Sequence, residues 1–181
     1  MTDRGPKIRL FVEADLREGV AVPLSPAQGH YLVGVMRLGP GAPVALFNGR
    51  DGEWRATLRL GGRREATAAP EARLRPQNAA ADLWLLFAPL KKARTDFLVE
   101  KAVELGAARL APVFTRRTAA ERLRPDRLRA LAVEAAEQCG ALAVPEIAAP
   151  APLAATLAGW DPARRLMFCD ETGAAPPAAA A

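Results

Sequence analysis

Cationic side chains directly follow two short apolar segments of the chain. The segments are "LWLLFAP" (residues 83–89) and "RLAPVF" (residues 109–114). The cations are Lys91, Lys92 and Arg94 after the first segment, and Arg116 and Arg117 after the second. Ammonium and guanidinium groups bind phosphates and carboxylates, so a ligand held by these side chains would be an anion. The alternative is that both loops are simply solvated.

The elements around these cations decide whether the two groups can meet. Residues 83–89 form a continuous apolar run, which is typical of a strand covered on both faces. Helical spacing follows this run, and we expect Thr95 to be the N-cap of the helix. Its buried stripe should contain Leu98, Ala102 and Leu105, and Gly106 should end it.

The same alternation continues along the chain. Residues 109–114 predict the next strand, and a second helix should run from Pro125 to Gly140 with Cys139 on its apolar face. A very short strand ("VPEI"), a short helix ("LAATLAGW") and a strand ("RLMFCDE") follow. This order predicts parallel strands joined by right-handed crossovers. Ligands bind beyond the carboxyl ends of such strands, so the sequence predicts an anion site at that edge.

Residues 1–75 have a different pattern, which predicts a small β-barrel with one helix. Strand patterns occupy residues 7–13, 43–49 and 53–60, and residues 65–74 fit an edge strand because they contain Pro70. Ser25, followed by Pro26 and Gln28, predicts a capped helix that ends near Arg37. Residues 76–82 resemble a linker. The predicted fold is therefore α/β with a leading barrel, divided into residues 1–75, 76–82 and 83–181.

The charge distribution favours an anionic polymer as partner. The net charge of the 181 residues is +5, and 21 of the 25 cations are arginines. Residues 91–129 carry 11 basic and 5 acidic residues, whereas residues 130–181 carry 2 basic and 6 acidic residues. Clustered arginines suit nucleic acid. No run approaches the roughly 18 apolar residues of a membrane span, so no membrane association is expected.

No single motif in the chain is a catalytic signature. The glycine-rich fingerprints of dinucleotide and nucleoside triphosphate sites are absent. His30 is the one histidine, and it suits a structural or RNA-contacting role better than that of a general base. Cys139 and Cys169 lack metal-ligand spacing, so we expect no metal and a reduced, cytoplasmic setting. Glu137 and Gln138 could fix a substrate, or they could simply be exposed.

The order of several blocks resembles one family. "LKKARTDFLVEKAVELGAARLAPVFTRRT", "AVEAAEQCG" and "VPEI" are similar to the ribosomal RNA small subunit methyltransferase E family, which belongs to the SPOUT class of knotted methyltransferases. "IRLFV", "GHYLVGVMRLGPG" and "LFNG" resemble the leading PUA-like domain of that family. The resemblance covers residues 7–171. One departure is local, because Ala141, Leu142 and Ala143 stand where the family commonly has arginine.

The resemblance implies both an activity and its partners. It implies transfer of a methyl group from S-adenosylmethionine to N3 of a uridine in 16S rRNA of the assembled small ribosomal subunit, by a cytoplasmic homodimer. The expected RNA-binding residues are Arg9, His30, Arg37, Lys91, Lys92, Arg94 and Arg117, and the possible substrate pocket contains Glu137 and Gln138. Of the arginine pair, Arg117 matches the family pattern Phe-Thr-x-Arg, and neighbours in an extended segment point to opposite sides. The catalytic residues stay unassigned.

The end of the chain departs from the family pattern. The family usually continues after the "RLMFCDE" strand with a Gly-Pro-Glu-Gly-Gly loop and a late segment that hold the methyl donor. Here "TGAAPPAAAA" follows instead. We therefore expect a truncated sequence, a donor site beyond Ala181 and no activity of these 181 residues alone. A non-catalytic RNA-binding protein is the alternative, and an unrelated nucleotide-using α/β enzyme is a third hypothesis.

Overall fold

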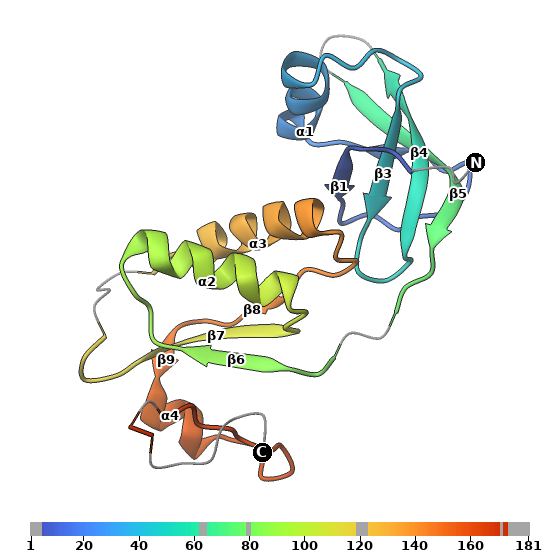
Figure 1. The fold of residues 1–181 in the computed structure, drawn as a ribbon. Helices are drawn as coiled ribbons and strands as arrows, with labels where there is room; N and C mark the ends of the chain where they lie inside the picture. Colours follow the sequence, from blue (N-terminus) through green and yellow to red (C-terminus); the bar gives the residue numbers. More distant parts are fainter. Residues whose placement is uncertain (1–4, 62–64, 79–80, 119–122, 171, 174–181) are drawn as a thin grey trace.

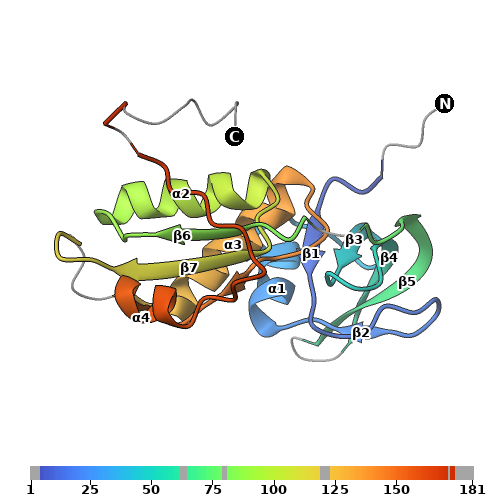
Figure 2. The same cartoon turned by 90° about the horizontal axis from the view of Figure 1, so that it is seen from below.

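The computed structural model describes residues 5–61, 65–78, 81–118, 123–170 and 172–173. It contains a β-barrel-like domain and an α/β domain that lie side by side, with the carboxyl end of helix α3 directed at strand β1 (Figures 1 and 2). The predicted fold class is confirmed.

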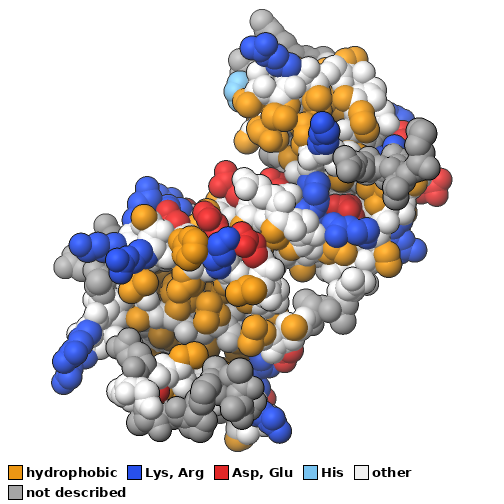
Figure 3. All heavy atoms as spheres, viewed as in Figure 1, with side chains coloured by type: hydrophobic (Ala, Val, Ile, Leu, Met, Phe, Trp, Pro, Cys, Tyr) orange, Lys and Arg blue, Asp and Glu red, His pale blue; other side chains and the backbone are white. Residues whose placement is uncertain are grey.

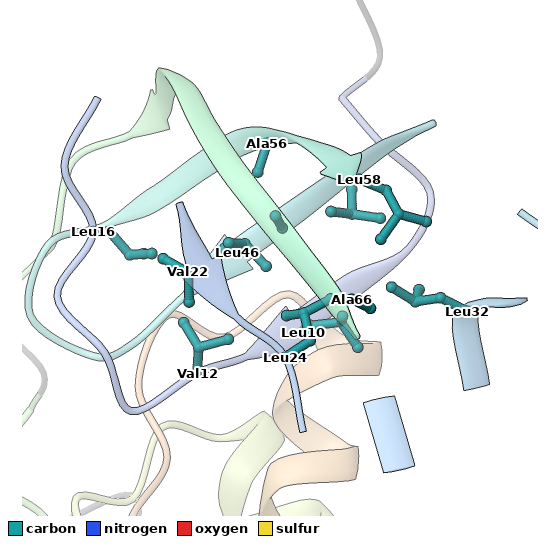
Figure 4. Packing of buried hydrophobic residues seen from close by; sticks show 12 residues of the cluster. Leu10, Val12, Leu16, Val22, Leu24, Leu32, Leu46, Ala56, Leu58 and Ala66 are labelled. Carbon is teal, nitrogen blue, oxygen red and sulfur yellow. The ribbon is translucent and has the colours of Figure 1, made fainter. Parts of the chain in front are cut away.

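The first domain is a five-stranded sheet with the order β1-β3-β4-β5-β2. Strand β1 is parallel to β3, and the other pairs are antiparallel. The strands are β1 (Arg9–Phe11), β2 (Val22–Pro23), β3 (Pro43–Phe47), β4 (Glu53–Leu60) and β5 (Ala66–Arg75). Alternate residues point inward and form the barrel core (Figure 4). Its buried members are Leu10, Val12, Leu16, Val22, Leu24, Leu32, Val44, Leu46, Ala56, Leu58, Ala66 and Ala68.

Strand β5 differs from the predicted edge strand, because the short β2 pairs with it at Thr67 and Ala68. Pro70 lies beyond this pairing, and the β4–β5 register shifts between Arg55 and Ala56, next to the Ala56–Pro70 pair. The missing N–H of a proline is tolerated at such an irregularity. Strand β5, which contains Pro70, therefore lies between β4 and β2, but β2 pairs with only two of its residues.

The helix of the barrel begins where the sequence predicts. Ser25 caps α1 (Pro26–His30), and the reciprocal Ser25–Gln28 capping box is formed. A π-helical turn, η1 (Tyr31–Val35), then continues it. The helix ends before Arg37, whose φ of 54° is the one positive value of a non-glycine residue in the described part of the chain. A left-handed arginine stops the helix at a cost in strain.

The second domain is a parallel sheet with two helices on one face. Its strand order is β6-β7-β8, and β9 pairs with the end of β7. Helices α2 and α3 cover one face, and α4 lies on the other side (Figure 1). The elements are β6 (Trp84–Phe87), α2 (Lys92–Glu104), β7 (Arg109–Phe114), α3 (Pro125–Cys139), β8 (Glu146–Ile147), β9 (Ala151–Pro152) and α4 (Leu153–Ala158).

A stack of aromatic and guanidinium groups holds the segment after α4 against β6. The Arg164 guanidinium lies 3.8 Å from the ring centroid of Trp84, and the two rings of Trp84 and Trp160 meet edge to face at 5.9 Å. Arg164 also donates to both carboxylate oxygens of Asp82 at 2.6 and 3.0 Å. These contacts cover one end of β6, but Trp84, Leu85 and Leu86 are only half-buried, so the strand is not fully covered on both faces as predicted.

Four predicted details of this domain are wrong. Helix α2 begins at Lys92, so Thr95 lies inside it, and Leu105 is 81 % exposed beyond its end. Cys139 is exposed, because the buried face of α3 passes through Leu128, Ala132, Ala135 and Ala136. Residues 165–170 form no strand. A strand needs a neighbour to pair its backbone, and no described segment pairs with these residues.

Candidate functional site

The carboxyl edge of the parallel sheet presents cations from two loops. Strands β6 and β7 pair in parallel, so both end at this edge, and α2 begins there. The side chains of Lys91, Lys92, Arg94, Arg116 and Arg117 are all exposed. None forms an ion pair with another described residue. Figure 3 shows Lys and Arg side chains gathered at this end of the domain. We call these five residues the cationic edge.

The two arginines occupy the centre of a tight turn after β7. Thr118 N donates to Thr115 O at 3.2 Å, and Thr115 N donates to Thr118 Oγ1 at 2.7 Å. These bonds close a turn around Arg116 and Arg117 and leave both side chains in solvent. The segment is therefore a turn, so the argument from alternation along an extended segment does not apply to these two side chains. The preference for Arg117 now depends on the family pattern alone.

The loop after β6 is fixed by a buried threonine. Thr95 is 3 % exposed, and its Oγ1 accepts from Leu90 N and donates to Leu90 O, both at 3.0 Å. Lys91 then occupies the N-cap position of α2 without a capping side chain. Thr95 is therefore not the predicted N-cap, and its side chain instead holds the loop that carries Lys91. The free N–H groups of the first turn add positive potential to the cationic edge.

His30 and Arg37 lie apart from this edge, in the barrel domain (Figure 1), where His30 ends α1 and Arg37 follows the η1 turn. Both are exposed. The His30 ring lies against Gly34, where an added Cβ would be 2.9 Å from its Cε1 atom. His30 also lines a hollow with Val33 and Leu60. The structure therefore exposes both residues on the barrel domain, and their binding to RNA stays a prediction.

The structure gives Arg9, a predicted RNA-binding residue, a set of partners within the protein. Its side chain is only 12 % exposed and joins the two domains. The guanidinium donates to Glu53 Oε1 in the barrel at 2.5 Å. It also donates to three backbone carbonyl oxygens in α3 and just after it, those of Ala136 at 2.5 Å, Glu137 at 2.9 Å and Ala141 at 2.7 Å. A guanidinium has five N–H donors, and four are used here. These bonds leave one N–H of the guanidinium unused, and binding of Arg9 to RNA stays a prediction.

Glu137 and Gln138 line one groove, and their role in holding a substrate stays a prediction. Glu137 Oε1 accepts from the backbone N–H of Phe11 at 2.9 Å, so this carboxylate belongs to the domain junction. Burial raises the pKa of Glu137, while the Phe11 N–H and the charge of Arg9 oppose that rise. Gln138 is exposed next to it. Both residues line a groove between the domains, together with Lys7 and Tyr31.

Sequence reasoning missed Glu53 and Arg75. Glu53 is 6 % exposed at the start of β4, and its second oxygen accepts from Arg75 Nε at 2.7 Å. Arg75 also donates to Gly140 O at 2.9 Å. Burial alone would raise the pKa of Glu53, but hydrogen bonds from Arg75 and Arg9 hold it below its usual value. Because Glu53 lies on the polar face of an alternating strand, nothing in its pattern marks it as buried.

The described residues offer no metal site. They contain no group of three or more His, Cys, Asp or Glu side chains that could hold a metal ion. They also contain no helix long and apolar enough to cross a membrane. The exposed cations of the cationic edge are suited to binding and orienting anions.

Two family models match the chain. A model of the RNA methyltransferase PUA domain matches residues 24–71, and a model of the RNA methyltransferase domain matches residues 77–180, which is more than half of the chain. The chain belongs to the RNA methyltransferase family. The matches follow the order barrel, then α/β domain, as the resemblance predicts.

Curated relatives carry the name that the motifs indicated. The chain is 28 % identical over 140 residues to the ribosomal RNA small subunit methyltransferase E of Rickettsia conorii, which covers 77 % of this chain and 57 % of the relative. It is 32 % identical over 148 residues to the protein of that name from Synechocystis, covering 78 % of this chain and 47 % of the relative. The predicted family is confirmed. The chain spans about half the length of these relatives.

Solved structures share the fold. A ribosomal RNA small subunit methyltransferase E from Neisseria gonorrhoeae bound to S-adenosylmethionine has a TM-score of 0.77 and 24 % identity, covering 86 % of this chain and 66 % of that chain. A methyltransferase from Legionella pneumophila with bound S-adenosylmethionine has a TM-score of 0.76 and 23 % identity, covering 84 % and 66 %. At this identity the likeness establishes the fold of both domains.

Proposed function

We propose that this RNA methyltransferase family member transfers a methyl group from S-adenosylmethionine to N3 of a uridine in 16S rRNA of the small ribosomal subunit. One observation carries the proposal: both domains match the family in order, and the curated relatives are ribosomal RNA small subunit methyltransferases E. The proposal includes the division into residues 1–75, 76–82 and 83–181, a homodimer and a cytoplasmic location.

The cationic edge supports the RNA-binding part of the proposal. Its five exposed cations come from two adjacent strand ends, and the Thr115–Thr118 bonds hold two of them in a fixed turn. Phosphate contacts of this kind position an RNA without reading its sequence. His30 and Arg37 on the barrel would provide a second contact surface. A base within structured RNA would then be extruded to reach the reacting atoms.

The proposed chemistry makes a specific demand on the site. N3 of uracil carries a proton and becomes nucleophilic only when that proton leaves. Cations placed near O2 or O4 would stabilise the negative charge that develops, and fixed placement would supply much of the remaining rate. Lys91, Lys92, Arg94 and Arg117 are the described residues suited to that role.

The described residues of this edge do not fit the methyl donor. S-adenosylmethionine carries a positive sulfonium beside its carboxylate, and the cations presented here would repel the sulfonium that holds the methyl group. No step through the donor is therefore assigned to these residues. This observation keeps the second candidate, RNA binding without catalysis, as the outcome that an experiment has to exclude.

The test is methyl transfer by the protein that contains this chain, with small subunits that lack the modification as substrate. We expect 3-methyluridine in the 16S rRNA. Arg117→Ala should cost about 1–3 kcal/mol in transition-state stabilisation, as the loss of a charged hydrogen bond does. Arg116→Ala, the matched control in the same turn, should cost less than about 1 kcal/mol. Both variants are compared at one salt concentration after a check of folding.

Two results would contradict parts of the proposal. RNA binding without any methyl transfer would leave only the non-catalytic alternative. Equal losses from Arg116→Ala and Arg117→Ala would show that the cationic edge acts as a diffuse electrostatic surface, without one directed arginine.

A further inference from the structure

The barrel meets the α/β domain through the outer face of three of its strands, β1, β3 and β4. In β1, Leu10 points into the barrel core, so Arg9 and Phe11 point outward. The cross-strand partners of Phe11 and Arg9 in β3 are Phe47 and Ala45, and Phe47 in turn pairs with Glu53 in β4. This outer face meets α3 and not solvent.

The two domains therefore share a hydrophobic core. Phe47 is fully buried, yet it packs in the cluster of the α/β domain with residues such as Phe87, Val99 and Leu128. Phe11 packs against the same cluster, with its ring 5.6 Å from that of Phe47. Domain interfaces within a chain are usually more polar and permit relative motion. An interface with a shared core is expected to be rigid.

Polar bonds fix the orientation within this apolar contact. The Arg9 guanidinium lies 4.4 Å from the Phe47 ring centroid and reaches past it to the last turn of α3. The final carbonyl groups of a helix have no partner within the helix, and the negative end of its dipole favours a cation. Arg75 makes the equivalent bond to Gly140, and Glu53 binds both arginines. We call Arg9, Glu53 and Arg75 the junction triad.

We propose that Arg9, held in place by Glu53, is a positioning residue that locks the barrel to the carboxyl end of α3. The barrel surface around His30 and the cationic edge of the α/β domain then meet one RNA at a fixed spacing. RNA recognition at these two surfaces rests on the proposed function, whereas the lock itself does not. A fixed spacing raises the effective concentration of the second surface once the first has bound.

The test compares Arg9→Ala, Arg9→Lys and the control Arg17→Ala, which removes the same charge from a side chain that is 76 % exposed. Spin labels on Glu71→Cys and Ala93→Cys, with Cys139 and Cys169 replaced by serine, report the distance distribution between the domains. Arg9→Ala should broaden it and Arg17→Ala should not. Arg9→Lys should not restore it, because an ammonium has three donors and cannot serve Glu53 and three carbonyls together.

RNA affinity provides the functional readout. Binding of a 16S rRNA transcript should weaken about tenfold in Arg9→Ala through the lost effective concentration, and an oligouridine too short to reach both domains should bind as before. Arg75→Ala should broaden the distance distribution and weaken binding of the transcript to a smaller extent. It replaces Arg9→Ala in the test if the Arg9→Ala variant does not fold.

Three results separate the possibilities. An unchanged distance distribution in Arg9→Ala and Arg75→Ala would overturn the lock. Equal weakening of both RNAs would also overturn it, because Arg9 would then contact RNA directly. If the unmodified protein binds neither RNA, the proposed function fails while the distance distribution still decides whether Arg9 locks the domains.

Discussion

Arginine has different roles in this chain according to the backbone that carries it. Arg9 and Arg75 end in bonds to a buried carboxylate and to helix carbonyls, whereas Arg116 and Arg117 lie exposed in a turn. All four have the same chemistry, and burial and nearby acceptors decide which of them can meet a phosphate. Glu137 is the acidic counterpart, because it is partly buried and accepts from the Phe11 N–H.

The first prediction concerns Glu137 and pH. Burial raises the pKa of Glu137 in the folded protein, so the protonated side chain favours folding. This contribution to stability is fully present below the unfolded pKa and is lost as pH rises through the folded pKa. Glu137→Gln keeps an oxygen for the Phe11 N–H without the charge. The variant should therefore gain thermal stability over the unmodified protein at neutral pH, and this gain should shrink as the pH is lowered.

Melting temperatures across a pH series measure this effect. Glu71→Gln, at an exposed position of β5, is the control and should follow the unmodified protein. A Glu137→Gln variant that is less stable at neutral pH would show that the ionised carboxylate is favoured at the junction.

At the scale of elements, the ends of helices do most of the positioning. Helix α2 begins at the cationic edge, and the carboxyl end of α3 meets the barrel. Helix α3 ends at Gly140 with a φ of 83°, and this glycine also gives its carbonyl to Arg75. A side chain would find open space there, so the cost of a substitution comes from the backbone conformation alone.

Gly140→Ala should accordingly destabilise the protein by about 1 kcal/mol, the usual cost of a left-handed non-glycine residue. Gly39→Ala is the matched control, because that site also has open space but no positive φ, and it should be neutral or slightly stabilising. Chemical denaturation of both variants gives the free energies of unfolding. Equal values for the two would mean that α3 can end equally well in another conformation.

The whole molecule should unfold as one unit, because Phe47 of the barrel completes the core of the α/β domain. The junction triad adds polar bonds around this contact. Two domains with separate cores would unfold independently, but here the loss of either domain exposes apolar surface of the other. The same rigidity supports the proposal that two RNA-binding surfaces act at a fixed spacing.

Phe47→Ala should therefore lower the stability of both domains together, by about 3–5 kcal/mol. Trp54 reports on the barrel and Trp84 on the α/β domain, so single-tryptophan variants can follow each transition by fluorescence. Phe97→Ala, at a site that is 60 % exposed on α2, is the control and should cost little. Separate midpoints for the two tryptophans in the protein that retains Phe47 would contradict a shared core.

The sequence by itself determined the local elements and the family. Strands β4 and β7 have the predicted bounds, α1 and α3 start at the predicted residues, and the motif order indicated the family that the comparisons confirm. These features depend on short-range patterns: alternation along a strand, a capping serine, a proline in the first turn and a glycine after the last. Such signals lie within a few residues of the element they specify.

Only the tertiary structure decided the roles of Arg9, Glu53 and Glu137. Arg9 was predicted to bind RNA, yet its acceptors lie in β4 and at the end of α3, far away in the sequence. Glu53 stands on the polar face of its strand, and it is buried where Arg9 and Arg75 bind its two carboxylate oxygens. Residues 165–170 have a strand-like pattern without a partner. A pattern specifies which side of an element is polar, but only packing determines what that side will contact.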